Sequence, residues 1–258
     1  MPASKDRPNS SLLRELEAVN ASMRDPAPAM LPYIPARRNR AAATRPRDIT
    51  LPAGFISPAL PMTAFAAPSG ELWLHEIKLD GIRIIARNDG QRVTLYSRSG
   101  DDLSGRYPLI VEAMARLPYC TIDGEAVACD EKGIASFELL QSGRQDDRVV
   151  LYAFDLIEHA GKDRRRDPLV RRKTDLDALV ADAGPGILAI TWVDGAERDG
   201  PALFEQACAL GQEGMMSKRK NSRYMSGRSP YWLKISNPAS DAARRAPQHG
   251  EDSEEAES

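Results

Sequence analysis

The sequence predicts an α+β fold in which two packed antiparallel sheets are flanked by helices. The first sign is Asp89-Gly90, a turn dipeptide typical of β-hairpins, which separates the apolar stretches 82–87 and 93–97. The second is that strand-like apolar runs further along the chain alternate with apolar residues at helical spacing. A chain of 258 residues can bury the core of one large domain and still leave tails.

The elements expected after the hairpin alternate between helices and buried strands. They cover, in chain order, residues 107–114 (helix), 149–157 (strand), 169–180 (helix), 187–192 (strand) and 202–210 (helix). The run 149–157 is almost continuously apolar, which is typical of a strand buried on both faces. The helix over 169–180 is expected to carry Arg171, Arg172 and Lys173 on its outer face.

Composition divides the chain into three parts. We expect residues 1–50 to form a flexible Pro-rich and Arg-rich arm with room for a short helix near its start, residues 51–238 to form the folded domain, and residues 239–258 to form an acidic disordered tail. The arginines between positions 37 and 47 either make the arm more soluble or contact DNA phosphates.

The overall charge excludes a strongly basic DNA-binding chain, because the formal net charge is −2. Any contact with DNA must therefore come from a local cluster of cations. The cysteines, Cys120, Cys129 and Cys208, have neither metal-ligand spacing nor the pattern of a disulfide framework. No apolar run is long enough to span a membrane, and the N-terminus lacks a signal region, so we expect a protein of the cytoplasm.

Lys78 is the central residue of the most informative stretch. It lies between the carboxylates of Glu76 and Asp80 and precedes Gly81 and Arg83. A free lysine is protonated at neutral pH, but one among cations and apolar walls can lose its proton and act as a nucleophile. The apolar residues on both sides predict strands, which would give this lysine a dry setting. The same stretch also suits a polar turn in which Gly81 takes a positive φ.

Charged side chains within strands and at their ends supply further candidates. Glu125 lies within an apolar strand, where a carboxylate needs a hydroxyl, a cation or a metal; an internal salt bridge would also satisfy it. Phe154 suits either the core or a flat wall for a purine base. The remaining candidates are Arg98, Glu213, Lys218, Arg228 and Lys234.

Six stretches occur in the order HEIKLDGIR, SRSG, IDGEAV, YAFDLIE, EGMMSKR and SGRSPYWLKIS. Together they resemble the nucleotidyltransferase motifs of ATP-dependent DNA ligases. The greatest similarity is to the ligase domain of bacterial end-joining ligases and to their small standalone relatives. The resemblance covers the chain from about Phe55 to Pro238. It implies an ATP-grasp-like nucleotidyltransferase fold with the nucleotide in the groove between the two sheets.

The resemblance implies a role for each candidate. Lys78 would be the nucleophile that takes AMP as a phosphoramide, and Asp80 would serve the later sealing step. Glu213, together with Glu125, would hold a divalent metal, because Mg²⁺ prefers hard oxygen ligands. The residues implied in nucleotide binding are Glu76 (adenine edge), Phe154 (base stacking), Glu125 (ribose), Arg83, Arg98 and Arg228 (nucleotide contacts), and Lys234 (α-phosphate) with Lys218 nearby.

The implied reaction consumes ATP with Mg²⁺ or Mn²⁺. It comprises lysine adenylation, transfer of AMP to a 5′-phosphate, and attack by a 3′-hydroxyl, on nicked or broken double-stranded DNA. The resemblance also implies a monomer that works at the bacterial nucleoid, with an end-joining or repair protein to help clamp the DNA. The alternatives are an RNA ligase or another nucleotidyltransferase of the same superfamily, and a module that binds ATP or DNA ends without sealing.

The sequence departs from the family pattern at two places. Ser236 stands where the family commonly has a second lysine, which removes one cation near the phosphates. Only a short acidic stretch follows residue 238, where most of the family continues into an OB-fold domain of roughly a hundred residues. Without that domain, we expect DNA to be held weakly and with a strong dependence on salt.

Overall fold

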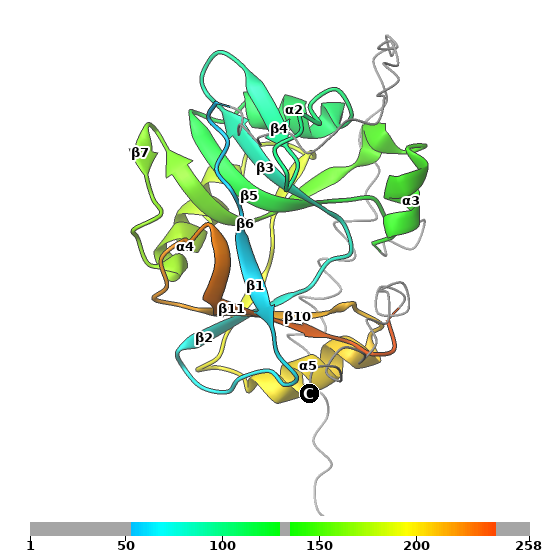
Figure 1. The fold of residues 1–258 in the computed structure, drawn as a ribbon, viewed down its shortest axis with the longest axis vertical. Coiled ribbons are helices and arrows are strands. Elements are labelled where there is room, and N and C mark those ends of the chain that lie inside the picture. Colours follow the sequence, from blue (N-terminus) through cyan, green and yellow to red (C-terminus); the bar gives the residue numbers. More distant parts are fainter. Residues whose placement is uncertain (1–52, 130–134, 241–258) are drawn as a thin grey trace, which may run out of the picture.

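The computed structural model describes residues 53–129 and 135–240 (Figure 1). The arm predicted over residues 1–50, and the predicted tail beyond Ser240, lie outside the described residues. A first sheet of five strands runs in the order β1 (Ala59–Thr63), β11 (Gly227–Ser236), β10 (Gly214–Arg219), β2 (Trp73–Ile77) and β9 (Trp192–Asp194).

The second sheet has six strands and lies above the first in Figure 1. Its order is β4 (Val93–Tyr96), β3 (Ile82–Asn88), β5 (Cys120–Val127), β6 (Val150–His159) and β7 (Lys162–Asp163), with β8 (Ile187–Ala189) paired to β6. The pairs β1–β11 and β6–β8 are parallel, and the other strand pairs are antiparallel. The predicted α+β fold of two mostly antiparallel sheets is thereby confirmed.

Helices cover the outer faces of the two sheets. They are α2 (Pro108–Ala115), α3 (Phe137–Ser142), α4 (Leu169–Val180) and α5 (Gly200–Ala209), with a short 3₁₀ turn at Asp146–Arg148. The predicted helices near 107–114, 169–180 and 202–210 correspond to α2, α4 and α5. The predicted hairpin joins β3 to β4, and Gly90 takes the positive φ of 81° that its turn requires. No helix of the described residues is long and apolar enough to cross a membrane.

The single strand predicted over residues 187–192 is wrong. The run divides into β8, which pairs with β6 of the second sheet, and β9, which pairs with β2 of the first. Ile190 lies between them, and its backbone N–H donates to the carbonyl of Ala153 at 2.8 Å. Both halves are apolar because both reach the interior, so hydrophobicity alone does not show that the chain changes sheets.

The outer-face placement of Arg172 and Lys173 is also wrong. Both side chains are fully buried, and of the three adjacent cations only Arg171 points to solvent. Positions 169, 172, 173 and 176 fall on one side of a helix, so both cations share the buried side of α4 with leucines. Arg172 pairs with Asp155 of β6, its Nε lying 2.6 Å from Oδ1. A buried partner is what allows a charge on this face.

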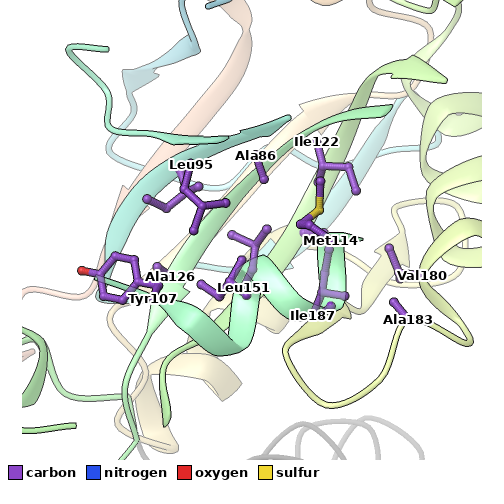
Figure 2. Packing of buried hydrophobic residues seen from close by; sticks show 14 of the residues in the cluster. Ala86, Leu95, Tyr107, Met114, Ile122, Ala126, Leu151, Val180, Ala183 and Ile187 are labelled. Atoms are coloured by element: carbon purple, nitrogen blue, oxygen red, sulfur yellow. The ribbon is translucent and has the colours of Figure 1, made fainter. Parts of the chain in front are cut away.

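The apolar core forms separate clusters on the two faces of the second sheet, because successive strand residues face opposite sides of a sheet. Ile84 belongs to the largest cluster, where the second sheet packs on α2 and α4; Figure 2 shows Met114 and Leu151 within it. The next residue, Ile85, belongs to a smaller cluster between the two sheets, together with Phe154 and Trp232. The space between the sheets is where the candidate site lies.

Candidate active site

The position of Lys78 is fixed by strand register. Strand β2 ends at Ile77, which lies opposite Met215 of β10, and the Lys78 backbone N–H donates to the carbonyl of Gly214 at 3.0 Å. Glu213 precedes that glycine, and its carboxylate forms an ion pair with the Lys78 ammonium. Both side chains are partly exposed, at 24% and 13%, so the pair can be reached from solvent. The predicted nucleophile and the predicted metal ligand are therefore direct neighbours.

Glu125 lies on β5, opposite Arg83 of β3. Burial raises the pKa of Glu125 to about 7, while the positive charges of Arg83 and Lys78 lower it and the charge of Glu213 raises it further. These couplings place Glu125 within electrostatic reach of both members of the ion pair. The three predicted residues Lys78, Glu125 and Glu213 thus form one cluster.

Gly81 brings the loop after Lys78 against β5. A Cβ at this position would lie 2.4 Å from the carbonyl oxygen of Ala126 and 2.8 Å from Cγ of Glu125. Gly81 is not among the glycines with positive φ, so the interpretation of this stretch as a turn that needs left-handed backbone is wrong. The glycine is required because the loop packs directly on the strand that carries Glu125.

Phe154 of β6 forms an apolar wall of the space between the sheets. Its ring meets Trp232 edge-to-face, with centroids 6.1 Å apart. Two cations lie against the Phe154 ring: Lys218 Nζ at 4.3 Å and Arg83 Cζ at 4.5 Å from the centroid. A purine that stacked on this ring would have to displace one of these cations from its face.

Glu76 is buried between two lysines. Its carboxylate oxygens lie 2.6 Å from Lys173 Nζ and 2.6 Å from Lys218 Nζ. Burial alone would raise the pKa of Glu76, but the two lysines outweigh it and hold the pKa below its usual value. Burial lowers the pKa of Lys218 to about 8, against the opposing effect of Glu76. Lys173 was missed as a member of the site because it was placed on the solvent side of its helix.

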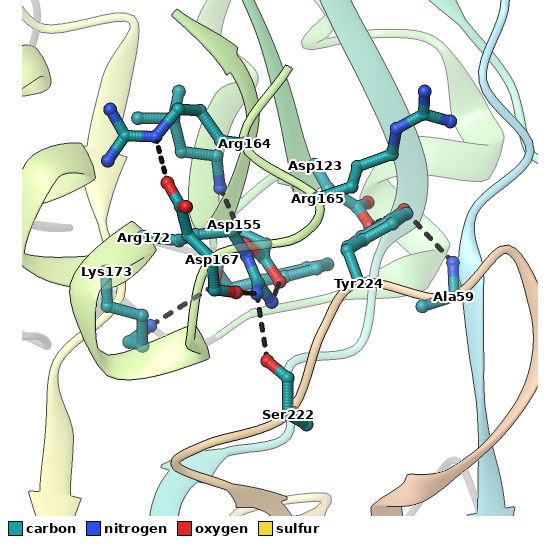
Figure 3. Close-up of polar contacts among 12 residues, drawn as sticks. Ala59, Asp123, Asp155, Arg164, Arg165, Asp167, Arg172, Lys173, Ser222 and Tyr224 are labelled. Atoms are coloured by element: carbon teal, nitrogen blue, oxygen red, sulfur yellow. Dashed lines mark hydrogen bonds and ion pairs between the residues drawn. The ribbon is translucent and has the colours of Figure 1, made fainter. Parts of the chain in front are cut away.

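Arg83 is held by a network that joins both sheets. Its Nε and Nη2 lie 2.5 Å and 2.7 Å from the two oxygens of the buried Asp123. Tyr224 donates its hydroxyl to Asp123 at 2.6 Å and accepts the backbone N–H of Ala59 at 3.0 Å (Figure 3). Asp123 and Tyr224 were not among the sequence candidates. A carboxylate inside the apolar strand around IDGEAV was the available signal for Asp123.

The remaining candidates differ in their position on the sheet and in their exposure to solvent. Lys234 of β11 pairs in register with Met216, which pairs with Glu76, so Lys234 faces the same side of the sheet as Glu76. Asp80 is half-buried in the loop after Lys78. Arg98 and Arg228 are exposed, and among the described residues no hydrogen bond or ion pair joins either to the other candidates. Their roles stay predictions.

A metal would find two carboxylates here, Glu125 and Glu213. Among the described residues there is no group of three His, Cys, Asp or Glu side chains arranged to hold an ion. Two carboxylates nevertheless suit Mg²⁺, which usually takes one or two protein oxygens and fills its other positions with water and substrate phosphates. The donor set therefore fits a metal that binds together with a nucleotide.

A lysine beside carboxylates, with an aromatic wall and buried cations between two mostly antiparallel sheets, is the arrangement expected of a covalent nucleotidyltransferase. The chain belongs to the ATP-dependent DNA ligase domain family, whose sequence model matches residues 61–236. The family membership, the fold and the order of its motifs agree with the resemblance on which the sequence predictions depend.

The chain covers different shares of the individual relatives that it resembles. It is 35% identical over 208 residues to the multifunctional non-homologous end joining protein LigD of Pseudomonas aeruginosa, covering 78% of this chain and 24% of LigD. It is 30% identical over 189 residues to the SPbeta prophage-derived DNA ligase-like protein LigB of Bacillus subtilis, covering 71% of this chain and 68% of LigB. The chain thus spans about a quarter of the LigD length.

Two solved structures of similar proteins share the fold of this chain. The ligase domain of LigD from M. tuberculosis superposes with a TM-score of 0.62 at 32% identity, covering 70% of this chain and 59% of that one. A mycobacterial DNA ligase D complexed with ATP and MES superposes with the same TM-score of 0.62, also at 32% identity, covering 70% of this chain and 60% of that one.

Proposed function

We propose that this chain is the catalytic domain of an ATP-dependent DNA ligase that becomes adenylated on Lys78. The observation that carries the proposal is the cluster of Lys78, Glu125 and Glu213, in a chain of the ligase family. In the first step, the Lys78 amine attacks the α-phosphorus of ATP. A P–N bond forms, the bond from the α-phosphorus to the bridging oxygen breaks, and pyrophosphate leaves.

The ion pair with Glu213 implies an order of events before that attack. Lys78 must be a neutral amine to act as a nucleophile, whereas its pairing with Glu213 favours the ammonium form. A divalent cation, when bound, would neutralise charge that develops on the phosphates. Glu213 would hold that cation, and in doing so it would release Lys78 from the ion pair. Glu213 is thereby proposed to couple metal binding to activation of the nucleophile.

Other residues are proposed to hold the nucleotide. Phe154 would stack on the adenine, and Glu76, which pairs with Lys218 beside the Phe154 ring, would contact the adenine edge. Lys234, on the same face of the sheet, would contact the α-phosphate as a point charge. Arg98 and Arg228 are exposed and would reach the phosphates only once substrate is bound. Asp80, in the loop after Lys78, is proposed to serve the sealing step.

The proposed substrate is nicked or broken double-stranded DNA in the bacterial cytoplasm. The support is that the relatives are named as DNA ligases or as an end-joining protein, and that the motifs match throughout residues 61–236. The protein is proposed to act as a monomer, with an end-joining or repair protein that helps to clamp the DNA. Incubation with labelled ATP and Mg²⁺, followed by nicked DNA or nicked RNA, tests both the chemistry and the substrate.

Ser236 offers a gain-of-function test of the proposed phosphate site. It pairs in register with Gly214, the residue that binds the backbone of Lys78, and it is exposed at the end of β11. Its side chain faces the same side as Lys234, two residues earlier. Ser236→Lys should therefore add a cation near the phosphates and raise the rate of AMP transfer about tenfold, as expected for one charge-assisted contact.

The measurement is the single-turnover rate of adenylate transfer to nicked DNA, with Ser236→Gln as a control of similar length without charge. If the lysine and glutamine variants react at equal rates, the site around Ser236 does not approach the reacting phosphates.

Gly81→Ala tests whether the loop must pack on β5. The added methyl would lie 2.4 Å from the Ala126 carbonyl oxygen, so the loop must move away from Glu125. We expect a loss of about 1–3 kcal/mol in the free energy of unfolding. Lysine adenylation should fall on the order of a hundredfold, because a shift of about 1 Å in a reacting group can cost that much.

Gly105→Ala is the matched control, since a Cβ there meets no atom within 4 Å. Chemical denaturation and the rate of labelling by ATP are the two readouts. Parent-like values for Gly81→Ala in both would contradict the close packing of this loop.

A further inference from the structure

A polar pocket lies apart from the cluster of Lys78, Glu125 and Glu213. It has a volume of ≈ 1040 Å³, and its walls come from the start of β2, the end of β10, the β10–β11 loop and the residues after β7. Four arginines line it: Arg165, Arg166, Arg219 and Arg223. We call the pocket lined by these four arginines the arginine pocket. None of them was a candidate from sequence.

The arginine pocket faces away from the space between the two sheets. Trp73 of β2 pairs in register with Arg219 of β10, and the neighbouring pair, Leu74 with Lys218, points between the sheets toward Phe154. Successive strand residues face opposite sides, so Trp73 and Arg219 lie on the outer side. Trp73 and Lys78 also lie at opposite ends of β2, about 16 Å apart at the usual rise of a strand. The two sites meet at Tyr224, which lines the pocket and bonds to Asp123 in the Arg83 network, but none of the four arginines belongs to the candidate site.

The charge of the pocket is strongly positive. Arg165 is neutralised by Asp163, its Nη2 lying 2.8 Å from Oδ2. Arg166, Arg219 and Arg223 form no ion pair among the described residues, and all three are exposed. Asp163 is the one acidic residue of the pocket lining. Three exposed guanidinium groups around one hollow suit a ligand with several phosphates, because each can make a bidentate contact.

Flat side chains accompany these cations. The Arg219 guanidinium lies over the Trp73 ring, 4.9 Å from its centroid, and Tyr231 is 40% exposed at the rim. Aromatic rings beside a line of cations are the usual surface for a nucleic-acid strand, whose sugars and bases contact the rings while its phosphates meet the cations. A purely acidic peptide would use the cations but not the rings.

The walls are held in place before any ligand binds. The backbone N–H of Tyr224 donates to the carbonyl of Arg165 at 2.9 Å, and the N–H of Leu169 donates to the carbonyl of Ser222 at 3.0 Å. Arg172 reaches the same Ser222 carbonyl at 3.0 Å (Figure 3). These bonds join segments that lie fifty or more positions apart in sequence. Binding therefore requires little ordering of the backbone, which favours affinity.

We propose that the arginine pocket binds the phosphodiester backbone of the DNA substrate, as a contact separate from the adenylation cleft. The inference rests on the proposed function for the identity of that substrate. It gives the chain a local source of DNA affinity despite its net charge of −2.

The test uses the full chain and a short nicked DNA duplex, with affinity measured by fluorescence anisotropy over a series of NaCl concentrations. Arg166→Ala/Arg223→Ala should weaken binding about tenfold or more and reduce the slope of log affinity against log salt by nearly two, since about 0.9 is lost for each phosphate contact. Both residues are exposed, so the folded state should be unchanged, and labelling of Lys78 by ATP should match the parent.

The matched control is Arg116→Ala/Arg144→Ala, which removes two exposed arginines near α2 and α3. Equal affinity and equal salt slope for the pocket variant and this control would overturn the proposal. A glutamate heptapeptide that binds the parent as tightly as DNA does, and is lost in the pocket variant, would also overturn it and point to an acidic protein segment.

The two proposals fail in different ways. A parent chain that binds nicked DNA through these arginines but takes no label from ATP would contradict the ligase function and leave the pocket in place. A parent chain that takes the label but binds DNA without these arginines would contradict the pocket alone. A parent that binds no DNA would overturn the pocket as a DNA site.

Discussion

Replacement of Lys78 by alanine should abolish the transfer of AMP from ATP to the protein. Lys78, at the end of β2, forms the ion pair with Glu213 and interacts electrostatically with Glu125. Without its amine there is no group to form the P–N bond, so the loss should be complete within detection. The measurement is incubation with α-labelled ATP and Mg²⁺, followed by a denaturing gel and a test of the labelled band for acid lability.

Two further variants make this result specific. Lys78→Arg keeps a cation that can pair with Glu213, but arginine does not lose its proton in proteins, so it should also remain unlabelled. Lys162→Ala, on the exposed β7, should label like the parent. Labelling of either Lys78 variant at the parental rate would show that another residue is the nucleophile.

Glu213→Gln should lower the rate of adenylation by about 10²–10³-fold, the range expected when a charged or polar partner is removed from a dry reacting site. The change keeps the shape of the side chain but removes the charge that pairs with Lys78 and that would hold a divalent cation. The concentration of Mg²⁺ needed for half-maximal rate should also rise. That shift distinguishes a role at the metal from a loss of folding.

The rate of labelling should be followed over a series of Mg²⁺ concentrations, with thermal unfolding measured in parallel. Glu205→Gln is the matched control, because Glu205 is an exposed carboxylate on α5, which packs on the same sheet. A variant at Glu213 with the parental rate and the parental Mg²⁺ dependence would contradict the proposal that Glu213 couples metal binding to release of Lys78.

Local patterns were sufficient to predict the fold class and most elements. The Asp89-Gly90 turn fixes the β3–β4 hairpin through the backbone that glycine allows. The helices α2, α4 and α5 follow from apolar residues at helical spacing. In both cases the deciding interactions join residues a few positions apart, so the signal is contained in a short stretch of sequence.

The same patterns failed where a choice between distant partners decided the outcome. Residues 187–192 are apolar throughout, but whether each half pairs with β6 or with β2 depends on the arrangement of both sheets. Because Arg172 and Lys173 are charged, the sequence pattern predicted that both side chains would face solvent. They are buried because Asp155 and Glu76, on strands far away in sequence, supply the compensating charge.

For the site, the sequence by itself determined the candidate residues and the family: the lysine of the K-x-D-G stretch, the carboxylates of IDGEAV and EGMMSKR, and the membership of the ligase family. Only the tertiary structure decided which of these side chains lie next to one another. The pairing of Lys78 with Glu213 depends on the register between β2 and β10, and the arginine pocket depends on hydrogen bonds between the segments around Arg165 and Tyr224. A motif specifies residue types over a few positions, whereas electrostatic contacts act over a few ångströms between segments that folding alone brings together.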